Sequence, residues 1–77
     1  MTEVIKYNKK QMNDILANGG SPASAKYLAA QFNYSYALAI RANKVEKHFN
    51  ELKAMYQDFQ RQAQAEGWQP AKIAKFE

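Results

Sequence analysis

The feature that most constrains this chain is a long stretch, from Ala23 to Glu66, that contains neither glycine nor proline. Such a stretch favours helix, because these two residues are the ones that interrupt a helix most strongly. A single helix over 22–66 would be roughly 68 Å long at about 1.5 Å per residue. A folded chain of 77 residues is much narrower than that. We therefore expect this stretch to turn back on itself.

The weakest part of the stretch is "NYSY", residues 33–36, which combines four poor or middling helix formers. Together they cost about 2 kcal/mol relative to alanine. Asn33 tolerates the left-handed conformation and Ser35 is able to cap a new helix, so a tight turn is predicted near 31–35. The resulting helices are expected over about 22–31 and over about 35–66.

A shorter helix is predicted over about 8–18, after an N-terminal segment, residues 1–7, that contains β-prone "EVIKY" and is expected to be extended. Asn8 has the properties of an N-cap. Gly19-Gly20 should end this helix, because glycine takes the left-handed conformation after a helix at little cost. Ser21-Pro22 then signals the start of the next helix.

The chain is expected to form one domain, with a helical part over 8–66 and a C-terminal tail over 67–77. Gly67 should stop the last helix. Trp68 is interpreted as a lid on the core, with an exposed anchor as the alternative. The other packing residues predicted in the tail are Ile73 and Phe76.

Apolar residues in the predicted long helix alternate at spacings of four and three, which is a heptad pattern. This seam consists of Leu38, Ala42, Val45, Phe49, Leu52, Tyr56, Phe59 and Ala63. A preceding helix of roughly 10 residues covers less than half of it, and the chain has no cysteine for disulfides. The prediction is an all-α helical hairpin or small bundle that self-associates as a dimer or larger.

The same part of the chain predicts a surface for a protein partner. Between Tyr27 and Ile40 the apolar residues do not keep to one helix face, which indicates burial on several sides. Tyrosines suit an interface because they combine a large area with a polar tip. A plain intramolecular core is the alternative. The candidate interface residues are Tyr34, Tyr36, Leu38, Ile40, Val45, Phe49, Leu52, Tyr56 and Phe59.

An alternative function follows from the net charge of +4, whose excess lies in the middle of the chain. In a helix-turn-helix with its turn near 31–35, Arg41 and Lys44 would reach DNA phosphates or base edges. The would-be recognition helix starts with tyrosine and aliphatic residues, and it is too long. A small DNA-binding regulator is therefore kept as the alternative to protein binding.

Neither metal, cofactor nor enzyme chemistry is expected. His48 is the single histidine, no cysteine accompanies it, and we interpret it as a surface or rim residue. The acidic residues are spread at helix-surface spacing, and no glycine-rich phosphate loop is present. No apolar run is long enough for a signal peptide or a membrane span, so no membrane association and a cytoplasmic location are expected.

Residues 35–62, "SYALAIRANKVEKHFNELKAMYQDFQRQ", carry "SYALA", a basic residue and "VEKHFNEL" in that order. This segment resembles small helical proteins of unassigned role that are encoded by phages and prophages. The resemblance implies a non-enzymatic phage accessory role in the host cytoplasm. Two such roles are natural. One is an inhibitor of a host factor or of a defence system, and the other is a small virion or assembly component. It assigns no functional residue.

Overall fold

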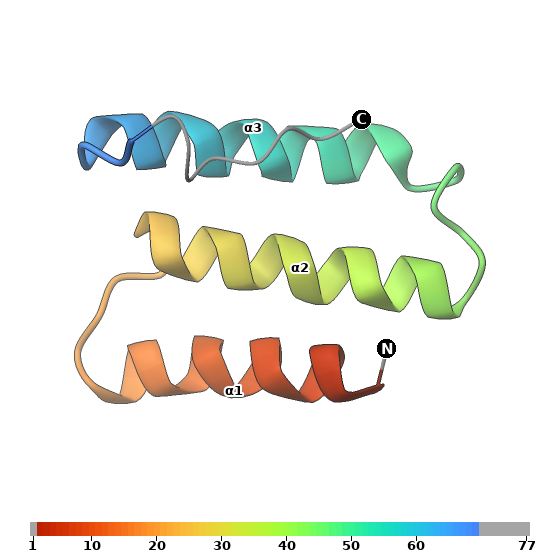
Figure 1. Cartoon of the computed structure of the whole chain (residues 1–77), viewed down its shortest axis with the longest axis horizontal. Helices are drawn as coiled ribbons and strands as arrows, with labels where there is room; N and C mark the ends of the chain where they lie inside the picture. Colours follow the sequence, from red (N-terminus) through yellow and green to blue (C-terminus); the bar gives the residue numbers. More distant parts are fainter. Residues whose placement is uncertain (1, 70–77) are drawn as a thin grey trace.

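A computed structural model describes residues 2–69, which form three helices and no strand. The helices are α1 (Thr2–Ala17), α2 (Ala25–Arg41) and α3 (Phe49–Ala65). α2 lies between the other two and packs against both, whereas α1 and α3 barely meet (Figure 1). The predicted all-α small bundle is confirmed, and its described part is a layer of three helices.

α1 begins at Thr2, so the prediction of an extended segment over 1–7 is wrong. Asn8 does not cap the helix either. It lies inside α1, is 6% exposed, and its Nδ2 donates a hydrogen bond to the Val4 carbonyl at 2.9 Å. The longer helix places Ile5, Asn8, Met12 and Ile15 on one face at spacings of three and four, and this face is the least exposed one of α1.

The turn between α1 and α2 was predicted at the right place. Gly19 has φ +79°, and the Gly20 amide donates to the Ile15 carbonyl at 2.7 Å, which closes a Schellman motif at the end of α1. α2 starts three residues later than Ser21-Pro22 indicated. Ser24 is its N-cap, and its Oγ accepts a hydrogen bond from the Tyr27 amide at 3.3 Å.

The predicted turn near 31–35 is wrong, because α2 continues through it to Arg41. The chain instead turns back over 42–48, where Asn43 has φ +55°. The Lys44 amide donates to the Ala39 carbonyl at 2.8 Å, so a Schellman motif ends this helix as well, with asparagine in the usual place of glycine. The long helix predicted over 35–66 is therefore two antiparallel helices.

Aromatic packing explains why α2 stays helical through its weak helix formers. The Phe32 ring lies 5.0 Å from Tyr56 of α3 and 5.6 Å from Tyr36, measured between ring centroids. Each such pair is worth about 0.5–1.5 kcal/mol beyond the area it buries. Together with that buried area, these contacts outweigh a propensity cost of about 2 kcal/mol.

The predicted seam is buried only in its α3 half. Leu52, Tyr56 and Phe59 pack with α2 in the hydrophobic core, together with Ala63. The α2 half does not continue this line, because the turn over 42–48 separates the two helices. Leu38 of α2 is accordingly 39% exposed, and Phe49, the first residue of α3 directly after the turn, is 38% exposed.

The end of α3 matches its prediction. Gly67 has φ +84°, and the Trp68 amide donates to the Ala63 carbonyl at 2.9 Å. Trp68 packs on the core with its ring 5.6 Å from Phe59, as expected for a lid. The tail residues predicted to pack beyond it, Ile73 and Phe76, lie outside the described residues.

Candidate functional site

A groove lies where the C-terminal half of α2 and the N-terminal half of α3 run side by side. Its volume is about 310 Å³. The floor and walls are apolar and consist of Leu38, Ala39, Ala42, Leu52 and Met55. The rim is polar and consists of Ser35, Lys44, His48 and Glu51. We call this hollow the α2–α3 groove.

Small side chains of α2 create the groove. Ala39 and Ala42 are three residues apart and therefore neighbours on one side of the helix. Their methyl groups leave space that a larger side chain would fill. Leu38 forms part of the wall and is 39% exposed, and Met55 of α3 is half-buried. Apolar atoms surrounded by a polar rim are the typical anatomy of a protein-binding surface.

Charges of both signs stand on the rim. His48 Nδ1 lies 3.5 Å from Glu51 Oε2, and the two side chains are 40% and 78% exposed. Such a solvated pair contributes at most about 1 kcal/mol, and only while the imidazole is protonated. Lys44 follows the last turn of α2, where the free carbonyl groups favour a cation. Within residues 2–69, no carboxylate forms an ion pair with Lys44.

The predicted interface residues are divided among three environments rather than gathered on one surface. The buried ones are Leu52, Tyr56 and Phe59. The partly buried ones are Tyr34, Tyr36 and Val45. The exposed ones are Leu38, Ile40 and Phe49. Of this whole set, Leu38 and Leu52 line the α2–α3 groove.

Sequence reasoning missed most of the groove. Ala39 and Met55 were not singled out, whereas His48 was interpreted as a surface or rim residue and does line the groove. The available signal was Asn43, an asparagine within a helical stretch, which tolerates the left-handed conformation as well as Asn33 does. A turn placed there brings the C-terminal half of α2 against the start of α3.

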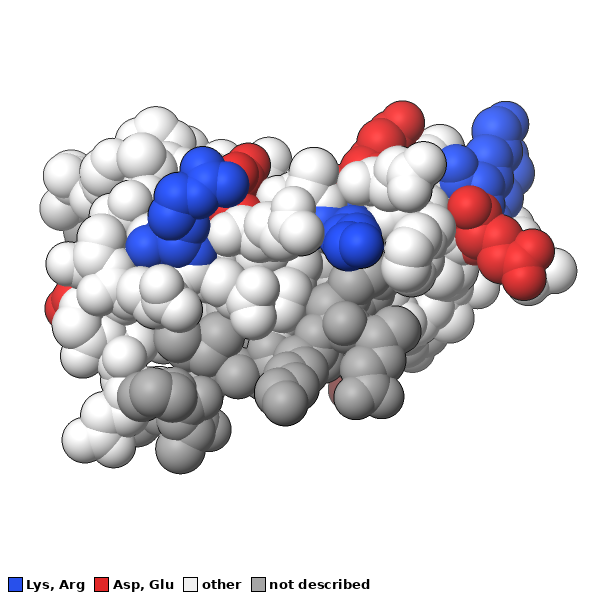
Figure 2. All heavy atoms as spheres, turned by 90° about the horizontal axis from the view of Figure 1, so that it is seen from above, with Lys and Arg blue, Asp and Glu red and all other residues white. Residues whose placement is uncertain are grey.

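The two residues of the DNA-binding alternative lie at the end of α2 and in the turn. Arg41 is the last residue of α2 and Lys44 comes just after it, so neither is on a separate recognition helix. The helix-turn-helix arrangement with a turn near 31–35 is not formed. On the face seen from above, acidic and basic side chains are interspersed (Figure 2).

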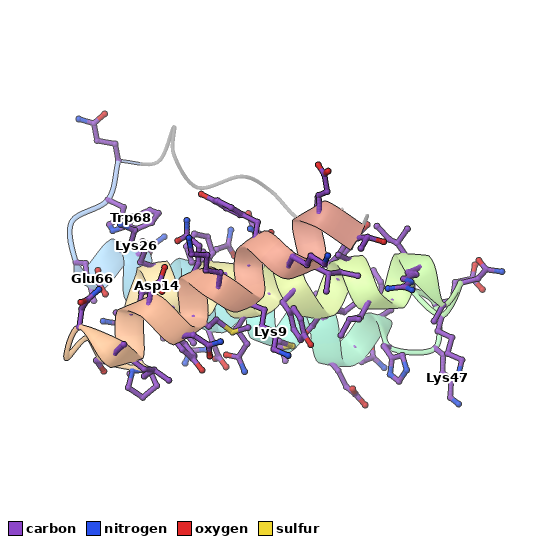
Figure 3. All side chains as sticks on the ribbon, turned by 90° about the horizontal axis from the view of Figure 1, so that it is seen from below. Lys9, Asp14, Lys26, Lys47, Glu66 and Trp68 are labelled. Atoms are coloured by element: carbon purple, nitrogen blue, oxygen red, sulfur yellow. The ribbon has the colours of Figure 1, made fainter. Side chains whose placement is uncertain are left out.

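A second hollow, of about 540 Å³, lies between α1 and α2 and is more polar. Its lining residues are Tyr7, Lys10, Gln11, Asp14, Ile15, Asn18, Gly20 and Lys26. Asp14 and Lys26 lie towards the end of the molecule where Glu66 and Trp68 are found, whereas Lys47 marks the opposite end (Figure 3). The two hollows are therefore separate sites.

No group of three potential metal-ligating side chains occurs within residues 2–69. Over the same residues, no helix combines the length and apolar character needed to cross a bilayer. Comparison with protein-family models, curated proteins and solved structures finds no match for this chain.

Proposed function

We propose that this chain is a non-enzymatic protein-binding module and that the α2–α3 groove is its docking surface. The observation that carries the proposal is an apolar hollow of about 310 Å³ with Leu38 exposed at its wall. A partner that inserts an apolar side chain there would remove both from water. The resemblance of residues 35–62 to small phage proteins points to the same class of function.

The polar groups of the rim favour binding over catalysis. Ser35 and His48 line the same groove, but no hydrogen bond joins them in the described structure. A nucleophile needs its base within hydrogen-bonding reach. Glu51 lies beside His48 but on the exposed rim, where water screens the pair. These groups suit recognition of a partner's polar side chains.

Site-specific photo-crosslinking in the native cells tests this proposal. A photoreactive amino acid in place of Leu38 should form an adduct with a discrete protein. The matched control carries the same group in place of Gln57, which is exposed on α3 outside the groove, and should not form that adduct.

A second substitution shows whether the adduct depends on the groove. Met55→Glu should abolish the adduct from position 38, whereas Lys53→Glu should leave it unchanged. Equal adducts from positions 38 and 57, or no protein adduct from either, would contradict the proposal. An adduct with nucleic acid would favour the DNA-binding alternative.

A further inference from the structure

The charges at one end of the groove indicate what kind of partner it takes. The residues from Arg41 to His48 contain three cations, Arg41, Lys44 and Lys47, against one carboxylate, Glu46. None of these cations forms an ion pair within the described residues. Of the three, Lys44 lines the groove, and Arg41 and Lys47 flank it in the sequence. Their positive charge is available to a partner.

Among the described residues that line the groove, Glu51 is the one that carries a carboxylate. Glu51 Oε2 lies 3.5 Å from His48 Nδ1, and no ion pair joins Glu51 to Lys44. A carboxylate of a partner would therefore find Lys44 uncompensated. Electrostatic complementarity of this kind selects partners and sets the direction in which they lie.

The shape of the groove suits a helix. α2 and α3 are antiparallel and adjacent (Figure 1). The hollow lies between the second half of α2 and the first half of α3, so a helix laid there would place one or two apolar side chains in it. The small side chains of Ala39 and Ala42 allow another backbone to approach closely. Met55 adapts to different apolar shapes because its side chain is unbranched and flexible. The described residues contain no strand edge to which an extended peptide would add.

We propose that the α2–α3 groove binds an acidic amphipathic helix of a partner protein, with an apolar side chain in the hollow and carboxylates at Lys44 and the neighbouring cations. This inference rests on the proposed function and specifies the partner's chemistry. The apolar face supplies the contact with Leu38 and Met55. The acidic face gives the helix its direction, with the carboxylates at the turn end.

Synthetic peptides provide the test. The first is an amphipathic peptide of roughly 18 residues, long enough to be helical in water, with leucines at i, i+3 and i+7 and glutamates on the polar face. The second has the same leucines with lysines in place of the glutamates, and the third is a scrambled acidic sequence. The readouts are the nuclear magnetic resonance signals of the Met55 methyl group and the His48 ring, which is the only histidine in the chain.

The acidic peptide should shift both signals in a saturable manner and bind at least about tenfold more tightly than the lysine peptide. Lys44→Glu should reverse this order. Lys44→Gln, which removes the charge without reversing it, should also weaken binding of the acidic peptide. This variant provides the test if Lys44→Glu fails to fold. Lys53→Glu, an exposed lysine of α3 that does not line the groove, should change affinity less than about twofold.

Three outcomes would overturn the inference. Equal binding of the acidic and lysine peptides would remove the charge preference. Absence of any shift, while the crosslinker at position 38 still captures its protein, would leave the proposed function standing and reject the acidic helix. Shifts of the same signals upon concentrating the protein alone, without a response to peptide, would assign the groove to a second copy of this chain.

Discussion

Glu66 ties the end of α3 to the start of α2. Its Oε2 accepts hydrogen bonds from the Ala25 amide at 2.7 Å and from Gln62 Nε2 at 2.9 Å. α2 has no acidic residue in its own first turn, so this carboxylate from another helix occupies the favourable position at its positive end. The hydrogen bond from Ala25, followed by that from Gln62, lowers the pKa of Glu66 below its ordinary value.

Acid should weaken this tie. Because the pKa of Glu66 is lower in the folded chain than in the unfolded chain, its contribution is fully present above the unfolded pKa, about 4.3. The contribution is lost as the pH falls through the folded pKa. Glu66→Gln keeps an oxygen that accepts the Ala25 hydrogen bond but does not titrate. Between about pH 6 and pH 3, urea unfolding should show a smaller loss of stability for the variant than for the wild type. Parallel losses would contradict this role.

The residues with positive φ show which helix ends can be predicted from single residues of the sequence. Gly19 and Gly67 were both identified as helix ends, since glycine occupies the left-handed conformation without steric cost. Asn43 occupies the same conformation and was missed, whereas Asn33 was chosen and is helical. Asn33 and Asn43 lie in the same helical stretch and have the same local preference. Packing of Phe32 on Tyr56 decides between them, and sequence alone does not contain that contact.

At the scale of the helices, the core of α3 can be separated from its exposed start. Leu52 is 2% exposed, whereas Phe49 is 38% exposed. Leu52→Ala should lower the free energy of unfolding by about 2–5 kcal/mol. Phe49→Ala should cost at least about 1 kcal/mol less than Leu52→Ala, because less of its side chain leaves water upon folding. Chemical denaturation of both variants measures the difference.

If the heptad seam were continuous, Phe49 and Leu52 would both be buried. Leu52→Ala and Phe49→Ala would then each cost about 2–5 kcal/mol. Equal and large losses of unfolding free energy in the two variants would therefore support a continuous seam and contradict the turn over 42–48. The seam pattern was correct in α3 from Leu52 onwards, because periodicity reports the buried face of a single helix. It failed across the turn because spacing in sequence does not reveal where one helix ends and the next begins.

At the scale of the whole molecule, α1 has the fewest buried residues of the three helices. Its one buried residue is Asn8, whereas Tyr7 and Leu16 are 62% and 45% exposed. The earlier reason to expect self-association, an uncovered seam, no longer holds because α2 covers the α3 half. The apolar surface of α1 provides another reason, and self-association stays a prediction.

Sedimentation at micromolar concentration should show a dimer or a larger species. Leu16→Glu should shift the protein towards monomer, because it places a charge in the apolar contact. Leu38→Glu, in the α2–α3 groove, should not change the association state. A monomer at every concentration, with a melting temperature independent of concentration, would contradict the prediction.

The groove exists only if the chain turns back at Asn43 and places α3 beside α2. Spin labels at Gln31 and Gln57 measure this most directly, because both residues are exposed and the chain has no cysteine of its own to compete for labelling. Adjacent helices lie about 8–10 Å apart between axes, so pulsed electron paramagnetic resonance should give a distance distribution centred below about 25 Å. A helix continuous from 35 to 66 would place Gln57 roughly 33 Å from residue 35 alone. A distribution centred at or beyond about 33 Å would contradict the turn, and with it the groove and its proposed partner.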